Sequence, residues 1–469
     1  MKTSLLAAAA IAALLSGCAA VGPDFKAPSA PQTASYRHAD APAAALTNQW
    51  WTLFNDATLN ALEARAFADS PSVQASAQRL AQAEAQLGAA RAATTPQVNL
   101  NAGSSYQRNS GNSSQAILQH NAVVKGMNNS LGASMSYEID AWGRVRRLVE
   151  SSQAQLEAAR DDHGGVLLTL SSQIASTYWQ LRGLDVQARI LADALATREE
   201  SEGLVQSRFD AGVSNELDLS RARIETANAR SALQDVHRQR TDAEHALAVL
   251  VGASPSEPLL AADARIDLPA PPQVPVGLPA SLLSQRPDLA GSVAALRALN
   301  AQVGVAEAAF YPSFSLTGNF GFVSQPLSDL LQSNSRQFSV GPLGLSLPIF
   351  DGGRNQANLA AAKARYAEGV ANHQQRLLTA LREVEDSLND VQQLQEQARV
   401  QAGAQTAAAR AGEVAKARYE RGVSNYLDVT DAQRSSLSAD RDAAQIATQR
   451  LLAAVAVARS LGGGWSAAN

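Results

Sequence analysis

The sequence predicts an α+β fold that is mostly α-helical, with long coiled-coil helices and a small set of strands. Hydrophobic residues, many of them alanine, make up 46% of the 469 residues, while aromatic residues make up only 5%. Such a composition favours long, closely packed helices over one thick globular core. Four segments alternate apolar and polar residues with the period of a β-strand. The same order of segments occurs twice, which indicates a duplicated half-protein.

The internal repeat covers most of the chain. Residues Arg208–Asp218 recur as Arg418–Asp428, at an offset of 210 positions. Ahead of the strands the offset is 216 positions, since Gly88 matches Gly304. A unit of this length is too long for a solenoid repeat. Each half is therefore predicted to hold a helix (56–93, then 287–310), two strands, a long helix, a turn and a second long helix.

The N-terminal residues are typical of a bacterial lipoprotein signal. Lys2 supplies a positive charge, and the apolar run from Leu5 to Leu15 is too short to span a bilayer. The following Leu15-Ser16-Gly17-Cys18 resembles a lipobox, whose cysteine becomes the first mature residue and carries lipid. Several acyl chains, at roughly 0.8 kcal/mol per buried CH₂, would anchor the chain. The alternative is an ordinary signal peptide with a chance cysteine. Ala19, where an aspartate would signal inner-membrane retention, points to the outer membrane.

The four predicted strands are about ten residues long, enough to cross a bilayer at a tilt. They are expected at about 97–107, 129–140, 313–323 and 338–350, and the phase of the last one slips near Gly341-Pro342, which predicts a bulge.

No later stretch holds ~18 consecutive apolar residues, so no membrane-spanning helix is expected. Four strands cannot close a barrel. Three copies of the chain would supply about twelve strands, and two copies about eight around a filled interior. The alternative is a small sheet with one face on a soluble core.

The long helices are predicted from the absence of proline between Gly143 and Asp210 and between Gly353 and Arg421. At 1.5 Å per residue, each would reach roughly 100 Å. Gly164-Gly165 is expected to bend or interrupt the first of them. In the turns at 211–215 and 421–425, a glycine suits the end of one helix, and Ser or Asn suits the start of the next. Each turn therefore joins an antiparallel helix pair whose tip lies far from the strands.

With these features in place, the chain resembles the outer-membrane efflux protein family (TolC/OprM-like), and within it the NodT-type lipoprotein branch. The specific motifs are the lipobox, the duplicated Gly-Val-Ser-Asn-x-Leu-Asp tips, and the segments Phe310–Gly318 and Phe350–Arg354. The resemblance implies a homotrimer in the outer-membrane lipid, with a twelve-stranded β-barrel, a helical barrel across the periplasm and a mixed equatorial belt. It also implies two protein partners, a periplasmic adaptor (membrane fusion) protein and an inner-membrane transporter, for which the resistance–nodulation–division (RND) type is expected. Such a duct exports drugs or other small toxic compounds.

The predicted organisation follows the repeat. It comprises a signal peptide (1–17), a lipidated N-terminal segment of the belt (18–55), the first repeat (56–251, with its tip at 211–217), a Pro-rich belt linker (252–283), the second repeat (284–461, with its tip at 421–427) and a C-terminal tail (462–469). The aromatic cluster at Trp50–Phe54 is interpreted as a packing anchor rather than a ligand site.

The resemblance assigns roles to residues at the helix tips. Asp428 and Asp431 match acidic residues that ring the periplasmic aperture, although aspartates near a helix start also simply favour the helix dipole. Tyr419 matches a tyrosine that bonds an aspartate of the neighbouring tip, here Asp218, and so holds the gate shut. The family arginine two residues after the second-tip glycine is replaced by Ser424, and an Arg221–Asp431 ion pair is a hypothetical substitute. The tip residues expected to contact the adaptor are Gly212, Val213, Ser214, Asn215, Gly422, Val423, Ser424 and Asn425.

The sequence argues against an enzyme, since it holds no nucleophile elbow, phosphate-binding loop, dinucleotide glycine pattern or metalloprotease motif. No cofactor, metal or nucleic-acid partner is expected: the six histidines are scattered, and the net charge of −4 is spread along the chain. His237 and His245 are interpreted as part of a solvated helix face. Two rival hypotheses are a trimeric coiled-coil adhesin and a structural outer-membrane lipoprotein without a pore.

Overall fold

The computed structural model describes residues 20–28, 35–38, 46–108, 110, 125–262, 267–276 and 285–466. The predicted signal peptide, Cys18 and most of the first hairpin loop lie outside these residues. The chain divides into two compact units. Unit 1 comprises residues 1–28, 80–159 and 292–372, and unit 2 comprises residues 29–79, 160–291 and 373–469.

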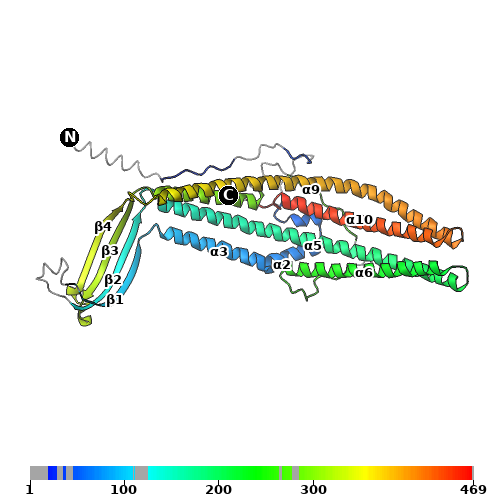
Figure 1. Ribbon diagram of the computed structural model, residues 1–469, viewed down its shortest axis with the longest axis horizontal. Coiled ribbons are helices and arrows are strands. Elements are labelled where there is room, and N and C mark those ends of the chain that lie inside the picture. Colours follow the sequence, from blue (N-terminus) through cyan, green and yellow to red (C-terminus); the bar gives the residue numbers. More distant parts are fainter. Residues whose placement is uncertain are drawn as a thin grey trace. The chain divides into compact units, whose positions relative to one another are not determined.

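Unit 1 contains one antiparallel sheet in which sequence order is also spatial order (Figure 1). Its strands are β1 (Gln97–Arg108), β2 (Lys125–Ile139), β3 (Ser313–Ser324) and β4 (Arg336–Ser346). Strand β4 ends four residues before the expected 350, because Pro348 has no N–H to donate to a ladder. Among the described residues, strands β1 and β4 form the two edges of this sheet and have no further strand beside them.

The predicted bulge in the last strand is confirmed. Leu316 faces Leu343, but Gly318 faces Val340, so Gly341 and Pro342 together oppose one residue of β3. Gly341 has a φ of 102°, which glycine adopts without a steric penalty.

Several large apolar side chains of the sheet are exposed in the part of the chain that the structure describes. Leu100 of β1 is 77% exposed and Val340 of β4 is 84% exposed. A sheet with both edges open and with apolar side chains exposed needs a partner or a lipid environment.

The helices follow the repeat. They are α2 (Ala57–Asp69), α3 (Pro71–Ala92), α5 (Arg144–Asp210), α6 (Glu216–Leu250), α8 (Pro287–Ala308), α9 (Arg354–Glu420) and α10 (Tyr426–Ser460), with short 3₁₀ turns at Trp50–Phe54, Leu327–Asp329 and Ser333–Ser335. Helices α5 and α9 each have 67 residues, and α6 and α10 each have 35. The bounds of each pair differ by the same 210 positions that relate the sequence motifs.

Two helix predictions are wrong. The single helix expected at 56–93 is two helices, since Ser70 is extended (φ −64°, ψ 126°) ahead of Pro71, which starts α3. Proline disfavours a helical conformation in the residue before it and is itself well suited to the first helical position. Conversely, Gly164-Gly165 does not interrupt α5, which continues through both residues.

Among the described residues, one helix, α8, is long and apolar enough to cross a membrane, with a mean hydropathy of 1.2 over its most apolar stretch. The sequence predicted none, because it lacks an uninterrupted apolar run. Within that stretch 56% of the residues are buried inside the protein, as in the core helix of a globular unit.

The core of unit 2 confirms the packing role of the aromatic cluster. Trp50 and Phe54 are buried, and the Phe54 ring centroid lies 5.4 Å from that of Trp179 on α5. The hydroxyl of Tyr178, also on α5, donates a hydrogen bond of 2.7 Å to Asp56 at the start of α2. The segment ahead of the first repeat is thus fastened to the middle of a long helix.

Gly164 leaves room on α5 for the side chain of Trp465. A Cβ atom at this position would lie 2.5 Å from Nε1 of Trp465 in the C-terminal tail, whereas one at Gly165 would meet only Cγ of Pro287 at 4.0 Å. The Trp465 ring therefore sits directly against the α5 backbone.

We expect Gly164→Ala to lower the free energy of unfolding by about 1–3 kcal/mol, because the tryptophan would have to move. Gly165→Ala is the matched control, because it makes the same change in helix propensity at a position where a Cβ atom fits. It should raise the free energy of unfolding by up to about 1 kcal/mol. Melting temperatures of the two variants in the same detergent test this, and equal shifts would contradict it.

Candidate gate at the helix tips

Both helix pairs of unit 2 turn in the same way (Figure 1). In the first turn the N–H of Val213 donates to the carbonyl of Arg208 at 2.9 Å, and in the second the N–H of Val423 donates to Arg418 at 3.0 Å. The intervening Gly212 has a φ of 72°, and Gly422 has 77°. These are Schellman motifs, and the predicted role of glycine at each helix end is confirmed.

Asparagine caps the helix that follows each turn. The side-chain oxygen of Asn215 accepts the N–H of Asp218 at 2.8 Å, and that of Asn425 accepts the N–H of Asp428 at 3.0 Å. The turns leave Val213 and Val423 exposed at the tips. The tips are therefore rigid in backbone and apolar at their ends, which suits contact with another protein.

The two predicted aperture aspartates are exposed in the single chain. Asp428 lies in the first turn of α10, where its charge also favours the helix dipole. Asp431 lies one turn further along and is 4.0 Å from the guanidinium of Arg434. Both carboxylates are accessible to solvent in the single chain.

The predicted gate residues on α6 pair with each other. Asp218 accepts a hydrogen bond of 3.1 Å from the amide of Asn215 and lies 3.7 Å from Arg221. The hypothetical Arg221–Asp431 ion pair is thus wrong for a single chain. The reason is local, because each charge pairs with an opposite charge one turn away on its own helix. On α6 Arg221 pairs with Asp218, and on α10 Asp431 pairs with Arg434.

Tyr419 lies inside the tip, 7% exposed. Its ring centroid is 5.6 Å from that of Tyr426, and the Arg208 guanidinium stacks over it at 4.8 Å. Burial raises the pKa of the Tyr419 phenol, the Arg208 cation lowers it, and the carboxylate of Asp218 raises it. Tyr419 and Asp218 therefore lie within electrostatic reach of each other in one chain, although the hydrogen bonds of Asp218 described above go elsewhere.

A buried ion cluster, which the sequence patterns did not predict, joins the two helix pairs. Glu225 of α6 is 5% exposed. Its carboxylate lies 3.3 Å from Arg198 of α5 and accepts a hydrogen bond of 3.0 Å from Nε of Arg434 on α10. The internal repeat carried a signal for this cluster. Arg434 matches Ile224 of the first half, so one half has a cation where the other half has an apolar residue.

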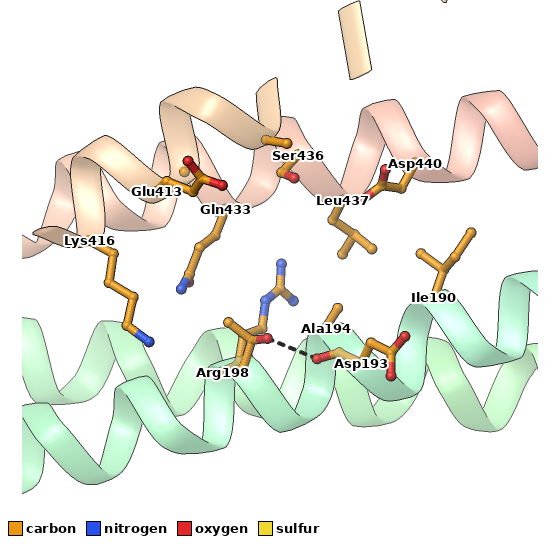
Figure 2. Close-up of a pocket in the computed structure, with 13 residues that line it drawn as sticks. Ile190, Asp193, Ala194, Arg198, Glu413, Lys416, Gln433, Ser436, Leu437 and Asp440 are labelled. Atoms are coloured by element: carbon orange, nitrogen blue, oxygen red, sulfur yellow. Dashed lines mark hydrogen bonds between the residues drawn. The ribbon is translucent and has the colours of Figure 1, made fainter. Parts of the chain in front are cut away.

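Beside Arg198 of this cluster, residues of α5, α9 and α10 line an open cavity of about 420 Å³ (Figure 2). Arg198 points into it from α5, while Lys416 of α9 and Gln433 of α10 point toward α5. At its margins Lys416 is 3.1 Å from Glu200, and Gln433 donates a hydrogen bond of 3.1 Å to Ser201. The two helix pairs are thus held by polar contacts beside a hollow and, nearer the tip, by a buried apolar cluster that includes Leu219 of α6 and Tyr426 of α10.

Among the residues that the structure describes, no group of three or more His, Cys, Asp or Glu side chains is arranged to hold a metal ion. The site offers apolar tips, exposed carboxylates and a hollow between the helix pairs.

Comparisons with known proteins agree with this arrangement. The family model described as outer membrane efflux protein matches residues 62–253 and 278–463. Outer membrane protein OprJ of Pseudomonas aeruginosa is 32% identical over 480 residues, covering 99% of this chain and 97% of that protein. Probable outer membrane lipoprotein SilC of Salmonella typhimurium is 27% identical over 96% of this chain and 97% of that protein. The solved outer-membrane channel OprN matches with a TM-score of 0.87 and 32% identity, over 95% of this chain and 99% of that one.

Proposed function

Because this chain belongs to the outer membrane efflux protein family, we propose that three copies join their sheets into one barrel of about twelve strands and form the exit duct of a tripartite efflux pump. The sheet carries the proposal. It has two open edges, β1 and β4, and exposes Leu100 and Val340. In lipid each unpaired backbone group costs several kcal/mol, so edge pairing between copies is strongly favoured.

The membrane attachment has two parts in this proposal. The protein resides in the outer membrane, the shared barrel crosses it, and Cys18 carries lipid as in the lipoprotein branch. The name of the relative SilC, a probable outer membrane lipoprotein, supports this assignment.

The tips are the proposed contact for the periplasmic adaptor. Their exposed apolar side chains, Val213 and Leu217 on the first tip and Val423 and Leu427 on the second, support this contact. An inner-membrane transporter, of the RND type in our proposal, supplies the energy. The cargo is drugs or other small toxic compounds, and the chain acts as a conduit without a catalytic step or a cofactor.

In the gate, threefold symmetry turns Asp428 and Asp431 into rings of carboxylates around the aperture. Such rings select or bind cations. Asp218 and Tyr419 are the proposed latch, a pairing supported by the effect of the Asp218 carboxylate on the pKa of the Tyr419 phenol.

Purified full-length protein reconstituted in planar bilayers tests the duct. We expect a trimer by mass measurement in detergent and ion conductance through the bilayer. A trimer without conductance would favour the structural lipoprotein, and a monomer that carries no current would overturn the duct altogether. A surface-exposed trimer that binds host cells without conducting would favour the adhesin.

The latch is tested in the same bilayers. We expect Asp218→Ala combined with Tyr419→Phe to raise single-channel conductance several-fold, because the resting tip loses a carboxylate and a phenol that restrain it. Asp210→Ala, which removes an exposed carboxylate at the end of α5, is the matched control. Unchanged conductance of the double variant would contradict the latch.

A further inference from the structure

Residues Ala20–Asp24 of unit 1 are held by a specific set of contacts at the first turn of α5 and on α8. The N–H of Val21 donates a hydrogen bond of 2.9 Å to the carbonyl of Trp142. The side-chain amide of Asn300 on α8 donates one of 2.7 Å to the carbonyl of Pro23. This segment follows the predicted lipidation site almost directly, so its contacts fix where the first described residues of the predicted mature chain lie.

Arg147 is the centre of this binding site. Its side chain is buried, and Nε donates a hydrogen bond of 3.2 Å to the carbonyl of Val21. Nη2 donates to the carbonyl of Gly22 at 3.1 Å and to the carboxylate of Asp24 at 3.0 Å. Nη1 binds Glu150 at 2.8 Å, which neutralises the buried charge. A guanidinium that binds two consecutive carbonyls and a carboxylate recognises one conformation of the segment.

Glycines bring the two backbones into direct contact. Gly22 has a φ of 99°, and a Cβ atom on it would overlap the backbone of Gly304 on α8. A Cβ atom on Gly304 would lie 3.0 Å from the Val21 carbonyl and 3.0 Å from Cγ of Arg147. No larger residue fits at either position without displacing the segment.

The internal repeat shows that this site is built once per chain. At the matching positions the second half has Ala357 in place of Arg147, and the first half has Glu84 in place of Asn300. A Cβ atom on Gly88, the match of Gly304, would meet no atom of the described residues within 4 Å. The halves therefore differ at the residues that touch Ala20–Asp24, a segment that itself occurs once.

We infer that Arg147, Asn300 and Gly304 form a seat that positions the lipid-bearing N-terminus at the strand-to-helix junction of the first repeat. The lipid part of this inference rests on the proposed modification of Cys18. Cys18 precedes Ala20 by two residues, so chain length alone keeps it within about 7 Å. At the same junction the rings of Trp142 and Tyr311 stack with centroids 5.0 Å apart. Tryptophan and tyrosine favour the membrane–water interface, where an acyl chain would enter the inner leaflet. Arg147 is thus a positioning residue for the anchor.

Hydrogen–deuterium exchange of the full-length protein, read by mass spectrometry of the N-terminal peptide, tests the seat. We expect Arg147→Ala to speed exchange of the Val21 amide at least about tenfold, because the carbonyls and carboxylate that fix the segment lose their donor. Arg160→Ala, which removes an exposed arginine of α5 thirteen residues further along the helix, should leave this rate unchanged.

A second matched pair keeps the test decisive if Arg147→Ala fails to fold. Gly304→Ala should speed Val21 exchange, while Gly88→Ala, an equal change at the matching open position, should not. Unchanged Val21 exchange in Gly304→Ala and in folded Arg147→Ala would overturn the seat. The mass of the same peptide reports acylation separately: a peptide without acyl mass would overturn the anchoring role even where the exchange data support the seat.

Discussion

Glu225→Gln is expected to destabilise the tip and to raise single-channel conductance several-fold. The substitution leaves the buried Arg198 without a counter-charge, and loss of one partner of a buried ion pair costs about 3–5 kcal/mol. It also removes the carboxylate that joins α5 and α6 to Arg434 of α10. Because the buried apolar cluster nearer the tip still joins the helix pairs in this variant, the expected response is a loosening of the pairs rather than global unfolding.

The matched control is Glu200→Gln, which removes another contact between the helix pairs, the exposed pair with Lys416. Exposed pairs contribute about 0–1 kcal/mol, so this variant should behave nearly as the wild type. Bilayer conductance and amide exchange of α6 and α10 measure both variants. Equal behaviour of the two would mean that the buried cluster does not restrain the tip.

Glu63→Gln is expected to stabilise the protein above neutral pH and to remove much of its pH dependence. Glu63 of α2 is fully buried, and neither carboxylate oxygen has a hydrogen-bond partner among the described residues. Burial raises the pKa of this carboxyl from 4.5 to about 9. Below pH 4.5 both the folded and the unfolded chain hold the proton, so ionisation of the group costs no stability. As the pH rises toward 9, only the unfolded chain releases it, so stability falls.

At pH 7.5 this loss amounts to at most about 4 kcal/mol, three pH units at 1.36 kcal/mol each. Glutamine keeps the shape of the side chain without a titrating proton. Melting temperatures should therefore match at pH 5 and diverge at pH 8, with the variant higher. Glu84→Gln, at an exposed position of α3, should show no such divergence. The interpretation fails if Glu63→Gln keeps the pH profile of the wild type.

Local rules made most of the fold predictable. Alternation located the four strands, and the slip at Gly341-Pro342 located the bulge. The paired Gly and Asn of each tip predicted the helix ends and starts, because a left-handed cap and an amide cap depend only on neighbouring residues. The break at Ser70-Pro71 follows the same kind of rule and could have been predicted from proline chemistry. The error at Gly164 differs, since that glycine serves a tryptophan 301 positions away.

The sequence by itself determined the duplication, the long helices, their capped tips, the lipobox and the family resemblance, all of which depend on short-range patterns or on self-similarity. Only the tertiary structure decided which charges meet. Glu225 and Arg434 are 209 positions apart, and Val21 and Arg147 are 126 apart. The sequence does not distinguish a charged helix residue that faces water from one that faces an oppositely charged partner. Only the packing of distant helices buries Glu225, Glu63 and Arg147. As a result Glu225 joins helices at the tip, Glu63 makes stability depend on pH, and Arg147 binds the N-terminal segment.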